Sequence, residues 1–144
     1  MKLSFQDYIS IKIHQTDLDL TSYIKSKLEP YNLAPEQNLV MMLLWEKDGL
    51  TQNQLAKALN KDKTNIARMI SNLEGKGFLN RSKCPNDQRS MEIYLTSCGK
   101  ELGNQVIPIL ENFNKVVCKG ISKEELKEME RLLHLMNHNV STII

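Results

Sequence analysis

Residues 51–99 read TQNQLAKALNKDKTNIARMISNLEGKGFLNRSKCPNDQRSMEIYLTSCG, a stretch that predicts two short helices followed by a basic hairpin. Thr51 and Gln54 form a Thr-x-x-Gln capping box, so we expect a helix to begin there. Asn60 and Lys61 interrupt its apolar stripe, and Asp62 offers a second N-cap directly afterwards. The first helix is therefore predicted to be short, with a second helix following at once.

The second helix is predicted to bury one face and expose the other. Its apolar residues recur at three-four spacing, at Ile66, Met69, Ile70 and Leu73. That spacing leaves Thr64, Asn65, Arg68 and Asn72 on the opposite face. An exposed helix face with amide and guanidinium groups can contact base edges in a DNA groove.

A strand hairpin is predicted after Gly77, which stands where a left-handed helix stop belongs. Residues 78–84 form a strand-like run, and residues 85–88 supply turn residues. In the following strand, Met91, Ile93 and Leu95 alternate with polar residues and Tyr94. The hairpin displays Arg81, Lys83 and Arg89, and this positive charge suits phosphate or a narrow minor groove.

Composition and charge agree with a nucleic-acid-binding segment inside an ordinary globular chain. The 144 residues are 41% hydrophobic and 25% charged, with a net charge of +2. Residues 47–89 contain nine basic and four acidic residues, a net +5, so the rest of the chain carries −3. This asymmetry indicates a DNA-binding face, although a merely solvated charged surface is the alternative that charge alone favours.

Long helices are predicted on both sides of this segment. We expect them at about residues 4–29, ended by Pro30, at 35–47, from Thr96 to before Gly120 with a bend at Pro108, and from Ser122 to the C-terminal end. In one subunit the first and last helices would leave apolar stripes uncovered. The sequence therefore predicts an isologous homodimer.

The whole chain resembles the MarR family of bacterial transcription regulators. The family-like features are Leu50-Thr51, the run from Leu73 to Leu79 with Arg81, the wing residues Asp87-Gln88-Arg89, and the run from Leu95 to Gly99. The resemblance implies a mostly α fold with a β wing, that is, a winged helix-turn-helix with long N- and C-terminal dimerisation helices. It implies one domain over residues 1–144, with residues 34–99 as the DNA-binding part and residues 1–33 and 100–144 as dimerisation helices.

The resemblance also implies roles for single residues. The helix from Asp62 would enter the major groove, and Arg89 would insert into the minor groove, held in place by Asp87. Together with the pattern above, it gives this set of candidate contacts to double-stranded DNA: Thr51, Gln52, Lys61, Lys63, Thr64, Asn65, Arg68, Arg81, Lys83, Asp87 and Arg89. The family places small aromatic or phenolic effectors between the dimerisation helices and the DNA-binding part, but no residue here identifies an effector.

Other chemistries find less support. Glu130, His134 and His138 share one helix face, yet two histidines near a helix C-terminus are more often solvated than metal-bound, and no cofactor is expected. Cys84, Cys98 and Cys118 lack the spacing of a zinc knuckle or disulfide framework, so we expect reduced thiols, with redox sensing left open. No nucleophile elbow or phosphate-binding glycine loop occurs, so no enzyme is expected.

The resulting hypothesis is a sequence-specific DNA-binding transcription regulator. We expect a ligand-responsive repressor that binds a near-palindromic operator as a homodimer. No run of about 20 apolar residues and no secretory signal is present, so we expect a cytoplasmic protein without a membrane partner. The alternative is a winged-helix module that binds an acidic protein partner through its basic wing.

Overall fold

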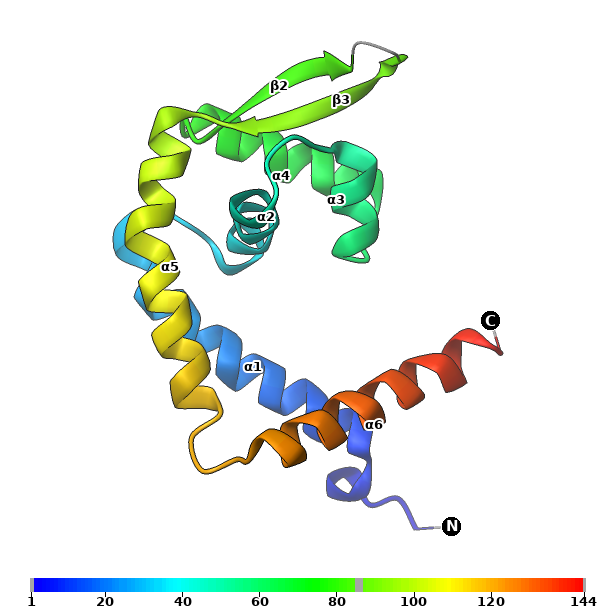
Figure 1. Ribbon diagram of the computed structural model, residues 1–144. Coiled ribbons are helices and arrows are strands. Elements are labelled where there is room, and N and C mark those ends of the chain that lie inside the picture. Colours follow the sequence, from blue (N-terminus) through cyan, green and yellow to red (C-terminus); the bar gives the residue numbers. More distant parts are fainter. Residues whose placement is uncertain (1, 85–86, 144) are drawn as a thin grey trace. The chain divides into compact units, whose positions relative to one another are not determined.

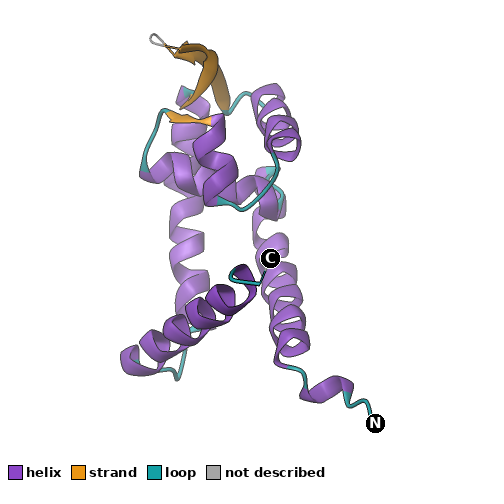
Figure 2. Cartoon of the chain, turned by 90° about the vertical axis from the view of Figure 1, so that its right-hand side faces the viewer, coloured by secondary structure: helices purple, strands orange, loops and turns teal. Residues whose placement is uncertain are grey.

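The computed structural model describes residues 2–84 and 87–143, except the side chains of Cys84, Asp87, Gln88 and Arg89. The chain divides into two compact units, Met1–Leu110 and Glu111–Ile144. The elements are, in order, η1 Phe5–Asp7, α1 Ile9–Leu28, η2 Glu29–Tyr31, α2 Pro35–Glu46, β1 Leu50–Thr51, α3 Gln52–Ala58, α4 Lys63–Gly75, β2 Leu79–Cys84, β3 Asp87–Leu95, α5 Ser97–Val117 and α6 Lys123–Ser141. Helices dominate, and one small sheet accompanies them (Figure 2), which confirms the predicted fold class.

The N-terminal helix begins later than the sequence predicts. The 3-10 helix η1 comes first, and the extended backbone of Tyr8 (φ −79°, ψ 121°) separates it from α1. Ser4, the predicted start, makes no side-chain cap. The helix ends where Pro30 predicts, because α1 stops at Leu28. Pro30 itself lies in the first turn of the 3-10 helix η2, which its fixed φ and missing N–H suit.

The helix-turn-helix is built from the two predicted caps. The Thr51 hydroxyl oxygen accepts from the Gln54 amide at 3.1 Å, and the Gln54 side chain accepts from the Thr51 amide at 2.8 Å. Asn60 takes a left-handed conformation (φ 52°) between the helices. The Asp62 carboxylate then accepts from the Asn65 amide at 2.7 Å and begins α4. Both predicted helix starts are therefore confirmed.

The core of the first unit lies under α4. Its predicted apolar face is buried, at Ile66, Met69, Ile70 and Leu73. Fully buried residues of α2, α3 and the sheet join it, among them Val40, Met41, Leu44, Leu55, Leu79 and Ile93. One face of α4 is thus held against the core, and the direction of its opposite face follows from that packing.

The sheet has three antiparallel strands in the order β1-β3-β2, and the β2–β3 hairpin lies over α4 (Figure 1). Strand β1 was not predicted, because a segment of two residues is too short to show an alternating pattern. Leu50 pairs with Ile93, and the Asp48 carboxylate accepts from the Leu95 amide at 2.9 Å. A register shift between Lys83 and Cys84 interrupts the β2–β3 ladder. These pairings attach the hairpin to the start of α3.

Helix α5 begins against the base of the hairpin. Thr96 accepts from the Gly99 amide at 3.0 Å and donates to the Gly77 carbonyl at 2.6 Å. A Cβ on Gly99 would lie 2.2 Å from the Phe78 carbonyl oxygen, so only glycine allows this approach. The Trp45 indole donates to the Gly99 carbonyl at 3.0 Å, which joins α2 to the same junction. The helix runs unbroken through Pro108.

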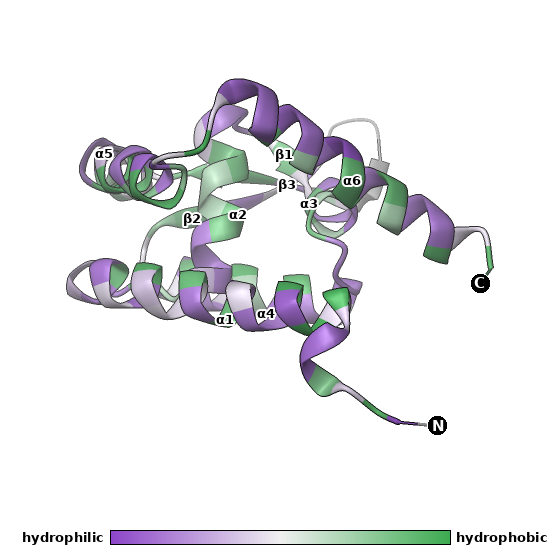
Figure 3. Cartoon of the chain, turned by 90° about the horizontal axis from the view of Figure 1, so that it is seen from below, coloured by the Kyte–Doolittle hydropathy of each residue, from purple (hydrophilic) through white to green (hydrophobic). Residues whose placement is uncertain are grey.

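The second unit contains the end of α5 and the amphipathic helix α6. The predicted capping box is present, since Ser122 accepts from the Glu125 amide at 3.1 Å and Glu125 accepts from the Ser122 amide at 3.0 Å. Hydrophobic and hydrophilic residues alternate along α6 (Figure 3). Five of its large apolar side chains are exposed, at Met129, Leu132, Leu133, Leu135 and Val140. Leu126 and Met136 are half-buried, and none of the described residues of α6 is buried.

Across residues 2–84 and 87–143, no helix has both the length and the apolar character that a membrane crossing requires.

Candidate nucleic-acid interface

The exposed face of α4 carries the polar residues that the sequence predicts there. Lys63, Thr64 and Arg68 are exposed, and Asn65 is half-buried. They lie in the first two turns of the helix, opposite the buried face. In helix-turn-helix proteins the N-terminal residues of the second helix contact base edges. The geometry therefore offers cationic and hydrogen-bonding groups at the end of α4 where such contacts are made.

Three of these side chains form a hydrogen-bonded chain along the helix. The Asn65 amide nitrogen Nδ2 donates to Asp62 Oδ2 at 3.3 Å. The Asn65 oxygen Oδ1 accepts from Arg68 Nη2 at 2.6 Å. Asp62 also caps the helix, so its carboxylate holds both the Asn65 backbone and side chain. Arg68 is thereby tied to the N-terminal turn through one intervening amide.

The candidates before α4 are partly occupied by contacts within the chain. Lys61 Nζ lies 3.0 Å from Glu36 Oε1, with 26% of the Lys61 side chain and 67% of the Glu36 side chain exposed. A pair this exposed is weak in water, so a phosphate could compete for the ammonium group. Thr51 and Gln52 are half-buried at the start of α3, where the Thr51 oxygen serves as the helix cap.

Arg81 joins the wing to α4. From strand β2 its Nη2 donates to the Ala67 carbonyl at 3.0 Å and to Ser71 Oγ at 2.5 Å. Its Nε lies 3.7 Å from Glu74 Oε1, and 28% of its side chain is exposed. These contacts give the guanidinium a structural role that sequence reasoning missed. The available sequence signal was the pair of small residues Ala67 and Ser71, one turn apart, which leaves room for a strand to pack on α4.

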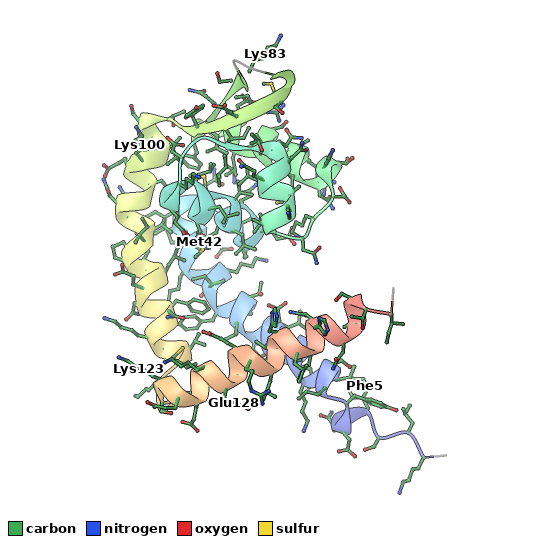
Figure 4. All side chains as sticks on the ribbon, turned by 45° about the vertical axis from the view of Figure 1, so that its right-hand side comes forward. Phe5, Met42, Lys83, Lys100, Lys123 and Glu128 are labelled. Atoms are coloured by element: carbon green, nitrogen blue, oxygen red, sulfur yellow. The ribbon has the colours of Figure 1, made fainter. Side chains whose placement is uncertain are left out.

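Lys83 lies toward the tip of the hairpin, and its side chain is exposed (Figure 4). Asp87 and Arg89 belong to β3, but their side chains lie outside the described part of the chain. The family-derived roles of these two residues therefore stay predictions.

Lys76 also contributes to the segment's positive charge but faces the chain itself. Its Nζ donates to the Asn32 carbonyl at 2.7 Å and to Gln37 Oε1 at 2.8 Å. This contact joins the end of α4 to the connection between α1 and α2. The net charge of residues 47–89 thus overstates the charge available to a ligand, because Lys76 and Arg81 are held by partners within the chain.

The comparisons with known proteins agree with this geometry. Residues 33–91, from just before α2 into β3, match the model of the MarR family. A structure of S. aureus MepR in complex with DNA has a TM-score of 0.84 and 26% identity, covering 96% of this chain and 99% of that one. The winged helix-turn-helix segment of this chain is therefore similar to that of the MarR family.

Two further structures of MarR proteins extend the likeness. A MarR transcriptional regulator from Methanosarcina mazei Go1 is 28% identical, with a TM-score of 0.79 and coverage of 94% of this chain and 98% of that one. A Listeria monocytogenes protein assigned to the family, complexed with a 26mer DNA, is 25% identical, with a TM-score of 0.81 and coverage of 99% and 91%. The likeness thus extends beyond the matched segment to the long helices of this chain.

The alternative chemistries gain no geometric support among the described residues of this chain. There, no three histidine, cysteine, aspartate or glutamate side chains gather as a metal site would require, Glu130, His134 and His138 included. Cys98 is exposed and Cys118 is half-buried, while the Cys84 side chain lies outside the described part.

Proposed function

We propose that this protein is a sequence-specific DNA-binding transcription regulator that acts as a homodimer on a near-palindromic operator. The observation that supports this most directly is α4. Its apolar face is buried, and its first two turns expose Lys63, Thr64 and Arg68 beside a wing that Arg81 joins to the same helix. MepR, of the same fold and 26% identical, has been solved in complex with DNA.

The contacts in this proposal fall into two classes. Arg68 contacts base edges in the major groove, and Asn65, which is hydrogen-bonded to it, contributes to base recognition. Thr51, Gln52, Lys61, Lys63, Thr64 and Lys83 contact the phosphate backbone, which fixes the position of the protein without selecting sequence. Arg81 supports the wing. By family resemblance, Arg89 enters the minor groove with Asp87 beside it.

Exposed apolar side chains support the homodimer. No described residue of α6 is buried, and the buried residues of α1, Ile24 and Leu28, both lie at its C-terminal end. Helices with such exposed apolar stripes are stable when a second chain covers them. A two-fold dimer would present two α4 helices to half-sites about 10 base pairs apart, or a multiple of that spacing.

Repression and its relief by a small aromatic or phenolic effector complete the proposal and follow from family resemblance alone. Titrating a panel of phenolic acids into the protein–DNA complex tests the effector. A compound that binds the DNA-free protein more tightly than the protein–DNA complex must lower the affinity for DNA by the same factor.

Selection of bound duplexes from a random DNA pool tests the proposed function. We expect enriched sequences with two-fold symmetry, and binding that weakens steeply with salt because phosphate contacts release counterions. Absence of any enriched sequence, together with capture of an acidic protein by the wing, would contradict the proposal and favour a protein-binding module.

A further inference from the structure

The hydrogen bonds that join the side chains of Asp62, Asn65 and Arg68 indicate which of them selects bases. Asn65 has two hydrogen-bonding ends, and both are engaged in the DNA-free protein. Its Nδ2 faces a carboxylate and must donate, and its Oδ1 faces a guanidinium and must accept. The chemistry of the two neighbours therefore assigns the orientation of the amide without ambiguity.

An asparagine that reads adenine needs both ends of its amide at once, one for N6 and one for N7. In Asn65 one Nδ2 hydrogen is already donated to Asp62 and one Oδ1 lone pair is already engaged by Arg68, so a base would have to share both ends of the amide with these partners. Both hydrogen bonds involve a charged partner, which makes them stronger than hydrogen bonds between neutral groups. Asn65 is therefore poorly suited to contact a base of its own.

Arg68, unlike Asn65, still has most of its hydrogen-bond donors free to contact a base. A guanidinium has five N–H groups in a planar fork, and Asn65 engages Nη2. The remaining donors still include a parallel pair, which matches the O6 and N7 acceptors of guanine. The side chain is exposed, and the contact to Asn65 restricts its rotamers before DNA arrives.

We infer that Asn65 is a positioning residue for Arg68, and that Arg68 selects a guanine in each operator half-site. This inference rests on the proposed function. Asp62 orients Asn65 from the helix N-terminus, and Asn65 holds the guanidinium at 2.6 Å. The base preference set by position 65 is thus exerted through position 68.

A double-mutant cycle on base preference tests the inference. The probe is the duplex selected from the random pool, fluorescently labelled, with each base pair of one half-site varied in turn. We expect Arg68→Ala to lower the preference for guanine at one base pair by about 5- to 150-fold. Asn65→Ala should lower the preference at that same base pair by about 2- to 12-fold, the effect of releasing one long side chain. The double variant should lose no more than Arg68→Ala.

Asn104→Ala is the matched control. Asn104 lies in α5, outside the proposed interface, and its Nδ2 donates to Glu101 Oε2 at 3.3 Å, the same i−3 contact to a carboxylate at the same distance. Both substitutions replace asparagine by alanine within a helix and so change helix propensity equally. An unchanged base preference of Asn104→Ala therefore shows that the effect of Asn65→Ala is specific. Urea unfolding of each variant checks that the fold is retained.

The outcomes separate the inference from the proposed function. If no duplex is enriched by the wild-type protein, the proposed function itself fails. If duplexes are enriched but Asn65→Ala relaxes a different base pair from Arg68→Ala, with additive losses in the double variant, Asn65 contacts its own base and the inference is overturned. It is equally overturned if Arg68→Ala weakens all duplexes alike, because that is the behaviour of a phosphate contact.

Discussion

Gly99, in the first turn of α5, lies against the Phe78 carbonyl just before strand β2. The Phe78 carbonyl that a Cβ would strike is itself held by the Thr96 amide at 3.0 Å, so neither backbone can move without losing a hydrogen bond. Gly75, in contrast, lies in α4 with nothing within 4 Å of a Cβ. Packing therefore requires a glycine at Gly99, whereas at Gly75 the space around the residue does not.

Alanine substitution should separate these two glycines. We expect Gly99→Ala to lower the free energy of unfolding by about 1–3 kcal/mol or more, because the new methyl group meets immobile backbone. Gly75→Ala should raise it by about 0.5–1 kcal/mol, because alanine loses less entropy in a helix. Urea unfolding followed by circular dichroism measures both, and a stabilised Gly99→Ala protein would contradict the packing at this junction.

At the scale of the elements, the wing is attached to α4 through Arg81. We expect Arg81→Ala to lower the free energy of unfolding by about 1.5–3 kcal/mol, the value of hydrogen bonds to a charged group. The amides of β2 should then exchange faster with solvent. Lys83→Ala removes the same charge from an exposed position of the same strand and should change stability by less than about 0.5 kcal/mol. Equal effects of the two substitutions would show that charge, not attachment, matters at Arg81.

Helix α6 depends on its capping box, and the box titrates. Hydrogen bonds from the backbone and side chain of Ser122 lower the pKa of Glu125 below its usual value of 4.5. Because the pKa of Glu125 is lower in the folded state, the carboxylate contributes its full stabilisation at pH values above 4.5. That stabilisation is lost as the pH falls through the lower pKa of the folded state. We therefore expect the first turn of α6 to fray under acid conditions.

Amide exchange in the first turn of α6, followed as the pH is lowered, measures this fraying. Glu125→Gln is the reference, because glutamine can fill the same place in a capping box and does not titrate. Its exchange, corrected for intrinsic rates, should not change over the interval in which the wild-type helix frays. A wild-type protein with the same flat profile would show that the carboxylate does not stabilise the cap.

At the scale of the whole molecule, the proposed dimer depends on the apolar residues of α6. Leu132, 39% exposed, is one of them. We expect Leu132→Glu to shift the protein from dimer to monomer in light scattering coupled to size exclusion. DNA affinity should fall by about 10²- to 10⁴-fold, because the second half-site contact is no longer intramolecular.

Asn137→Glu is the control for this dimer experiment. It adds the same charge at an exposed polar position of α6 and should leave the dimer intact. A wild-type protein that is monomeric and still binds its selected duplex tightly would contradict the dimer.

Features that depend on neighbours in sequence were predictable. The caps at Thr51, Asp62 and Ser122 join residues three apart, and their hydrogen bonds form as expected. The positive φ of Gly77 (85°) and the buried face of α4 likewise follow from local chemistry and helical period. Such features depend on only a few neighbouring residues, so sequence patterns predict them.

Features that depend on packing between distant residues were not predictable. The partners of Lys61, Lys76 and Arg81 lie 25, 44 and 14 residues away along the chain, and the sequence treats all three as free cations. Strand β1 exists because Ile93 lies beside Leu50, not because two residues favour a strand. A long basic side chain can reach any acceptor within several ångströms, so only the packing of helix, strand and loop determines whether it binds its own chain or remains available to DNA.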